Sequence, residues 1–175
     1  MSTITIRELI PDFAKDIRLN MSSVILSNIT TQLSQNQLYG CMLACAYALK
    51  DASFIKHIEN LSESVLSSAE IQAAKSAACI MAMNNVYYRT MGQINDEAFK
   101  NLPAGLRMQI IGKPGIEKLD FELYCLAISS INGCGTCINA HINVAKKAGI
   151  SDSDIQTVIK LSAVVNAANT SIALA

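Results

Sequence analysis

The sequence has no excess charge of either sign. Its 14 basic side chains balance 14 acidic ones, and only 16% of its 175 residues are charged. Proteins that bind nucleic acids or anionic membrane surfaces present clusters of lysine and arginine, and the longest basic cluster here is the pair Lys146-Lys147. The sequence therefore predicts no nucleic-acid partner and no membrane partner.

The sequence also lacks an uninterrupted apolar run of membrane-spanning length. The longest charge-free stretches, Leu19 to Leu49 and Leu123 to Ala145, are interrupted by polar residues or glycine, so we expect buried helices there. The first residues show no basic start followed by an apolar core, so we expect a cytoplasmic protein without a signal peptide. Because 51% of the residues are hydrophobic, we also expect subunit interfaces that cover surplus apolar surface.

Signals for β-structure are scarce. Tryptophan is absent, only four phenylalanines and five tyrosines are present, and no Asn-Gly or Asp-Gly hairpin turn occurs. Apolar residues instead recur at helical spacing in three regions, with loop signals at Pro103–Gly105 and Lys113–Gly115. These patterns predict one all-α domain over residues 1–175. The helical positions are Leu38, Met42, Cys45 and Leu49; Ile71, Ala74, Ala78, Met81 and Val86; and Ile155, Val158, Ile159, Ala163 and Val164.

Two helix starts resemble each other. Ser67 and Ser151, 84 residues apart, are each followed by an acid three residues later and then by Ile-Gln, which is typical of a capping box. The same offset relates His57 to His141. We therefore expect two related helical halves, residues 20–95 and 104–175, although shared capping chemistry alone explains such short similarities. The redox residues described next occur only in the second half.

Six cysteines are present, and four of them lie in apolar helical segments: Cys41, Cys45, Cys79 and Cys125. In a reducing compartment an even number of cysteines does not imply a disulfide framework, and a thiol in such a segment behaves as a small hydrophobic group. We expect these four cysteines to fill the core.

The other two cysteines form a Cys-x-x-Cys pair with a nearby histidine. Cys134 and Cys137 on the first turn of a helix lie close to disulfide-forming separation, and Asn132-Gly133 is a natural helix boundary before them. The helix start favours thiolate, most strongly for Cys134. His141 lies four residues after Cys137 and on the same helical face, where its imidazole can act as a base.

Other interpretations of this segment stay open. A zinc site with Cys134, Cys137 and His141 lacks a fourth ligand, and covalent haem attachment needs a histidine at position 138, which is isoleucine. A third interpretation is that the two cysteines only pack in the core. It does not explain the glycines on both sides of Cys134, which suggest close backbone geometry. Glu122 is either the carboxylate that orients His141 or an exposed glutamate at a helix start.

The spacing of Glu122, Cys134-Gly-Thr-Cys137 and His141 resembles the active-site signature of the alkylhydroperoxidase D family, in the carboxymuconolactone decarboxylase-like superfamily. The similarity covers nearly the whole chain, in blocks that keep their order. These blocks are Pro11–Asn20, Met83–Arg89, Gly105–Met108 with Pro114–Ile116, and Phe121–Leu123 through Ile131–Cys134.

The resemblance implies an all-helical homotrimeric thiol peroxidase that reduces organic hydroperoxides to alcohols without a bound cofactor. Cys137 would then be the peroxidatic thiolate, Cys134 would resolve its sulfenic acid to a redox-active disulfide, and His141 and Glu122 would relay the proton. A dihydrolipoyl protein of the 2-oxoacid dehydrogenase system would supply electrons as an external dithiol, and a peroxiredoxin is a further implied partner. We expect Cys134, nearer the helix start, to be the better placed thiol for exchange with a partner disulfide.

One position departs from the family pattern. Members have a histidine immediately before the second cysteine, where this chain has Thr136, whose hydroxyl does not titrate. Peroxidase activity could therefore be lower while disulfide exchange persists. The alternatives are the decarboxylase chemistry of superfamily relatives, which needs no cysteine pair, and a non-catalytic dithiol or zinc-binding module. We expect His57 to be a surface or packing residue.

Overall fold

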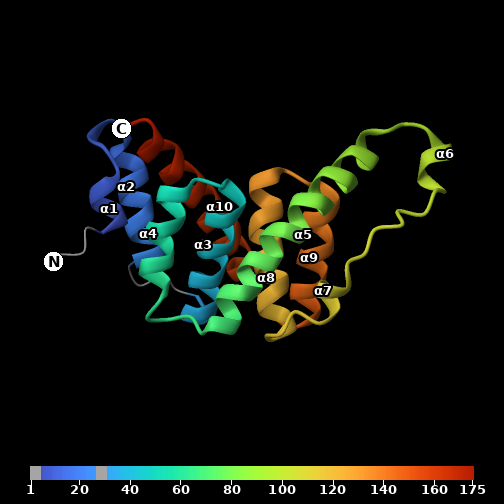
Figure 1. Ribbon diagram of the computed structural model, residues 1–175, viewed down its shortest axis with the longest axis horizontal. Coiled ribbons are helices and arrows are strands. Elements are labelled where there is room, and N and C mark those ends of the chain that lie inside the picture. The colour runs from blue at the N-terminus through green and yellow to red at the C-terminus, as the bar shows by residue number, and fades with distance from the viewer. Residues whose placement is uncertain (1–4, 27–30) are drawn as a thin grey trace.

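The computed structural model describes residues 5–26 and 31–175, and all regular structure in these residues is helical. The all-α prediction is confirmed. The helices are α1 (Ile6–Leu9), the 3₁₀ turn η1 (Asp12–Ala14), α2 (Lys15–Met21), the π-helical turn η2 (Ser22–Leu26), α3 (Gln35–Leu49), α4 (Ala52–Ser62), α5 (Ser68–Gln93), α6 (Glu97–Lys100), α7 (Gln109–Gly112), α8 (Lys118–Asn132), α9 (Gly135–Lys147) and α10 (Asp152–Ala173) (Figure 1).

Helices α3 and α8 form the centre of the fold. They pack against each other, and both also contact α5 and α10. Residues 40–46 of α3 and 121–129 of α8 are buried without interruption, which matches helices that are apolar around most of their circumference. The close approach of the two helices depends on Gly40, because a Cβ atom there would overlap the Tyr124 ring.

Each of the two charge-free stretches forms more than one helix. In the second stretch α8 ends at Asn132, and the chain turns at Gly133 into α9. In the first stretch α2 and η2 precede α3, and residues 27–30 lie outside the described part of the chain. Among the described residues, no helix combines the length and the hydropathy that a membrane crossing requires.

Both expected helix starts are capped. The Ser67 hydroxyl accepts a hydrogen bond from the Glu70 N–H, and the Glu70 carboxylate accepts one in return from the Ser67 N–H. The Ser151 hydroxyl likewise accepts from the Asp154 N–H, but the Asp154 carboxylate binds Thr31 and the Ser151 hydroxyl. The second start is therefore a serine cap without the reciprocal backbone bond of a capping box, since aspartate is one carbon shorter than glutamate.

The order of the helices supports the expected repeat. α8 begins at residue 118, 83 residues after α3 begins at residue 35, and α9 begins at residue 135, 83 residues after α4 begins at residue 52. α10 begins 84 residues after α5, at 152 and 68. We propose that residues 20–95 and 104–175 are diverged copies of one helical unit. The 83-residue offset places Ile58, not His57, opposite His141.

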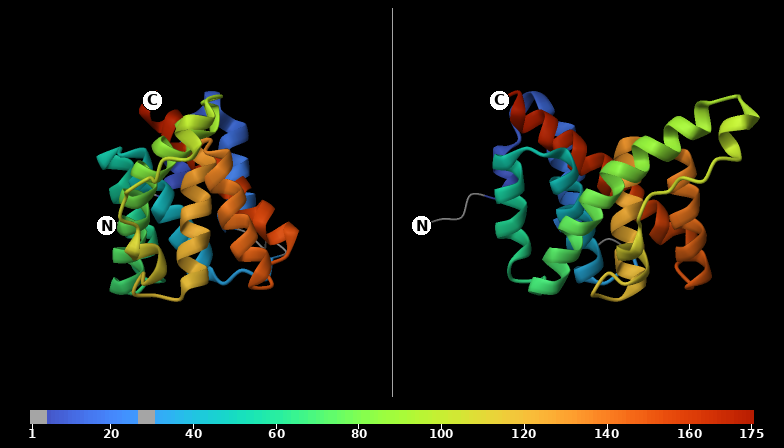
Figure 2. Two further views of the ribbon diagram at one scale, coloured as in Figure 1. Left: turned by 90° about the vertical axis from the view of Figure 1, so that its right-hand side faces the viewer. Right: turned by 45° about the vertical axis from the view of Figure 1, so that its right-hand side comes forward.

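The C-terminal part of α5 projects from the rest of the molecule together with α6 and the loop that follows it (Figures 1 and 2). Val86, expected on a buried helical face, is 58% exposed where α5 leaves the core. Phe99 and Leu102 in the same projection are 45% and 62% exposed. This projecting arm, residues 86–104, therefore presents apolar side chains to its surroundings.

Candidate active site

A sharp turn between α8 and α9 positions the two cysteines. Gly133 ends α8 with φ of 64°, in the left-handed region that favours glycine, and the Cys134 N–H donates to the Ser129 carbonyl oxygen. The predicted helix boundary at Asn132-Gly133 is confirmed. The expected close backbone approach is not found, because a Cβ atom at Gly133 or Gly135 would meet no atom within 4 Å.

Cys134 and Cys137 are joined in a disulfide across the first turn of α9. Cys134 is the N-cap residue, Cys137 lies one turn later, and their Cα atoms are 5.3 Å apart, within the usual range for a disulfide. The Cys137 N–H points at the Cys134 sulfur at 3.4 Å. This N–H and the positive end of α9 stabilise negative charge on Cys134 when the bond is reduced.

His141 and Glu122 meet in the interior beside the disulfide. His141 Nδ1 lies 2.7 Å from Glu122 Oε2, and both side chains are buried. The α8–α9 turn brings these residues, 19 positions apart, onto facing helix surfaces. Glu122 is thus no exposed helix-start residue. With Nδ1–H donating to the carboxylate, the second ring nitrogen of a neutral His141 carries the lone pair and can accept a proton.

An apolar cavity of about 290 Å³ opens onto this site. Cys137, His141 and Glu122 all contribute to its wall, together with Met108 and Ile111 from the segment before α8. Cys137 is 5% exposed, whereas Cys134 is completely buried. We expected Cys134 to be the better placed thiol for exchange with a partner disulfide. In the oxidised chain this expectation is not met, because a molecule in the cavity reaches the disulfide from the Cys137 side.

Asn84 lies in the same wall, and no sequence signal pointed to a role for it. Its side chain is 4% exposed, and its Oδ1 atom has no hydrogen-bond partner among the described residues. Its main-chain oxygen lies 3.8 Å from the Cys137 sulfur and can accept a hydrogen bond from the reduced thiol. A buried amide without a partner is costly, so this group is available to a ligand in the cavity.

The remaining cysteines divide into two classes. Cys41, Cys45 and Cys125 are buried, as expected for core residues, and burial raises the pKa of all three thiols, that of Cys45 to about 12. They stay protonated and unreactive at neutral pH. The prediction for Cys79 was wrong: this thiol is exposed, because its position on α5 lies just outside the stripe of that helix that faces the core.

The zinc alternative gains no fourth ligand from the fold. Within residues 5–26 and 31–175, no group of three or more histidine, cysteine, aspartate or glutamate side chains is arranged to hold a metal ion. His57 is partly buried on α4, in the half without the cysteine pair.

Known proteins are similar in sequence to this chain over almost its full length. Residues 97–175 match the carboxymuconolactone decarboxylase family. Two relatives carry the name alkyl hydroperoxide reductase AhpD. The relative from Coxiella burnetii (strain Dugway 5J108-111) is 48% identical over 162 residues, and the relative from Hyphomonas neptunium is 49% identical over 168 residues. These alignments cover 93% and 96% of this chain, and 92% of each relative. The chain belongs to the AhpD family. A third AhpD relative, from Streptomyces avermitilis, is 45% identical over 98% of this chain and 96% of its own length.

Thr136 directly precedes Cys137 in the chain. It lies on the first turn of α9, contributes to the cavity wall and is exposed. Since its hydroxyl does not titrate, the buried pair of His141 and Glu122 is the available acid–base group beside Cys137.

Proposed function

We propose that this chain is a thiol peroxidase that reduces organic hydroperoxides through a dithiol–disulfide cycle. The observation on which this depends is the placement of Cys137, His141 and Glu122 in the wall of one cavity, with Cys134 bonded to Cys137. The AhpD relatives, whose name states an alkyl hydroperoxide reductase, support the same activity. The apolar lining favours alkyl or aryl hydroperoxides over hydrogen peroxide.

In the first step, Cys137 gives its proton to the free nitrogen of His141, and the Glu122 carboxylate stabilises the imidazolium through Nδ1. The thiolate attacks the terminal oxygen of the hydroperoxide. An S–O bond forms while the O–O bond breaks, and the leaving alkoxide takes the proton from His141. The products are the Cys137 sulfenic acid and the alcohol.

In the second step, the Cys134 thiolate attacks the Cys137 sulfur, and the sulfenic hydroxyl leaves as water after gaining the Cys134 proton. The Cys137 N–H and the start of α9 favour the thiolate of Cys134. An external dithiol then reduces the disulfide. Overall, one hydroperoxide and one dithiol give one alcohol, one water and one disulfide.

Asn84 has a place in this scheme. Its amide lies in the cavity wall next to Cys137, and its Oδ1 atom has no partner in the part of the chain that the structure describes. We infer that it accepts a hydrogen bond from the hydroperoxide O–H and holds the terminal oxygen towards the sulfur. Thr136 has no role as a base, so the proton relay depends on His141 and Glu122.

The electron donor is, in this proposal, a dithiol of the dihydrolipoamide type on a partner protein. In this proposal the apolar cavity receives a slender chain that ends in two thiols, and Cys137 in the cavity wall is the sulfur that such a donor reaches first. The reduced pair could pass electrons on to a peroxiredoxin in the same way. Such a cycle requires the reducing conditions of the cytoplasm.

We further propose a homotrimer. The projecting arm exposes Phe99 and Leu102, which a free monomer would leave in water. Packing of each arm against the next copy around a three-fold axis would bury these side chains. Light scattering coupled to size exclusion should give three times the chain mass of 18.8 kDa.

The peroxidase proposal is tested with the reduced chain and cumene hydroperoxide in the absence of a donor. We expect loss of two thiols for each alcohol formed and recovery of the Cys134–Cys137 disulfide. Cys137→Ser should form no alcohol, while Cys79→Ser should react as the unchanged chain does. Alcohol formation by Cys137→Ser at the unchanged rate would refute the assignment. With the unchanged chain, dihydrolipoamide and thioredoxin are then compared as donors.

A further inference from the structure

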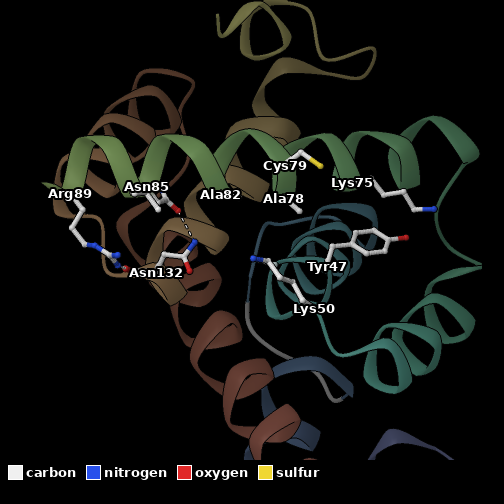
Figure 3. A pocket seen from close by; sticks show the side chains of 11 residues that line it. Tyr47, Lys50, Lys75, Ala78, Cys79, Ala82, Asn85, Arg89 and Asn132 are labelled. Atoms are coloured by element: carbon white, nitrogen blue, oxygen red, sulfur yellow. Dashed lines mark hydrogen bonds between the residues drawn. The ribbon is translucent and has the colours of Figure 1, made fainter. Parts of the chain in front are cut away.

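A second and larger cavity, of about 560 Å³, lies on a different face of α5 from the active-site cavity. Helix α5 forms one wall of it through residues spaced along one stripe from Lys75 to Arg89, whereas Met81, Asn84 and Tyr88 face the active site. The end of α3 forms the opposite wall, and Asn132 closes one end (Figure 3). Its volume is within the range of small-molecule sites. The peroxidase scheme makes no use of it.

Three cations line this cavity and no carboxylate does. They are Lys50, Lys75 and Arg89. The Lys75 ammonium lies 3.8 Å from the Glu59 carboxylate, whose negative charge partly offsets the positive potential at the far end of the cavity. Within the described residues, no ion pair is formed by Lys50, and Arg89 donates to the neutral main-chain oxygen of Asn132. Because the whole chain has no net charge, this is a local excess of positive charge.

Lys50 has an unusual backbone for its residue type. It caps α3 with φ of 63°, and it is the single non-glycine residue with positive φ within the described residues. Glycine is the usual residue at such a cap, and a side chain there costs about 1 kcal/mol. Gly133, by contrast, occupies the left-handed cap at the end of α8. The lysine at this position therefore departs from the backbone preference for glycine, and its side chain reaches into the space below α5 (Figure 3).

The rest of the cavity wall is mostly apolar. Ala78, Ala82 and Val86 on α5 and Ala48 on α3 leave room for an aliphatic group between the helices. The side chains of Asn85 and Asn132 bond to each other at the Arg89 end. The chemistry that complements such a site is an anionic head group with an unbranched apolar tail.

We propose that this cavity binds a fatty carboxylate. The carboxylate lies between the Lys50 ammonium and the Arg89 guanidinium, and the tail runs along the alanines of α5. The site is independent of the peroxidase scheme, since α5 separates it from Cys137.

Dodecanoate, below its micellar concentration, is the probe, and calorimetric titration of the unchanged chain measures its affinity. We expect saturable binding of one dodecanoate per chain, and no binding of dodecyltrimethylammonium, which has the same tail and the opposite charge. Lys50→Gly should weaken binding by about two- to fivefold, because it removes one ionic contact at an exposed lysine. Its thermal midpoint should not fall, because glycine suits the left-handed backbone. Lys160→Ala, at an exposed lysine on α10 away from the cavity, should leave the affinity unchanged.

The exposed Cys79 thiol in the cavity wall gives a second measurement. In the oxidised chain, dodecanoate should slow alkylation of Cys79 by iodoacetamide, as followed by mass spectrometry. Equal affinity of Lys50→Gly and the unchanged chain, or equal binding of the cationic detergent, would overturn the proposal. The proposal would also be overturned if dodecanoate dissociated the oligomer into monomers without protecting Cys79. The cavity would then be a contact between copies of this chain.

Discussion

Replacing Glu122 by glutamine isolates the charge of the buried carboxylate. Glutamine has nearly the same volume, and its side-chain oxygen can still accept from His141 Nδ1, which lies 2.7 Å from the present carboxylate. The orientation of the imidazole is therefore kept, while the negative charge that stabilises the imidazolium is lost. A hydrogen bond to a charged group contributes about 1.5–3 kcal/mol and a neutral one about 0.5–1.5 kcal/mol, so loss of the charge alone removes about 1–1.5 kcal/mol, a loss of about five- to thirteenfold in the rate of thiol oxidation.

The assay is single-turnover oxidation of the reduced chain by cumene hydroperoxide, followed by loss of thiols in stopped flow. Glu117→Gln is the matched control, because Glu117 is an exposed glutamate at the start of the same helix. It should react at the rate of the unchanged chain. Circular dichroism verifies that both variants are folded. If Glu122→Gln oxidised within twofold of the unchanged chain, the carboxylate would have no part in the proton relay.

Two further results concern stability. Gly133→Ala should lower the free energy of unfolding by about 1 kcal/mol, because φ is 64° there. Gly135→Ala should be neutral or stabilising, since Gly135 has ordinary helical geometry and open space around it. Chemical denaturation of both variants measures the difference in the free energy of unfolding. Hydrogen bonds, chiefly from Ser151, hold the pKa of Asp154 below its ordinary value of 3.8. The stability this contributes is present above that ordinary value and is lost as the pH falls through the folded pKa. The unchanged chain should therefore lose stability below pH 4 more steeply than Asp154→Asn, while Asp16→Asn, at an exposed site, should follow the unchanged chain.

Much of the helical framework follows from local sequence signals. Ser67 and Ser151 mark the starts of α5 and α10, and Gly133 marks the end of α8, because caps and left-handed turns depend on a few adjacent residues. The exposure of Val86 could not be predicted in this way. Its helical spacing continues that of the buried face, and only the tertiary arrangement shows that α5 extends beyond its neighbours.

The candidate site was predictable where its residues share one helix. Cys134, Cys137 and His141 follow from spacing on α9, whereas the contact between Glu122 and His141 depends on the packing of α8 against α9. Asn84 was missed because asparagine has no titratable group and comes from a separate helix.

The central claim, that Cys137 is the sulfur that hydroperoxide oxidises, is tested most directly by trapping its sulfenic acid. In Cys134→Ser no resolving thiol is present, so one equivalent of cumene hydroperoxide followed by dimedone should give a single adduct on the peptide that contains Cys137. An adduct on the Cys79 peptide, or no adduct with the hydroperoxide unconsumed, would contradict the account.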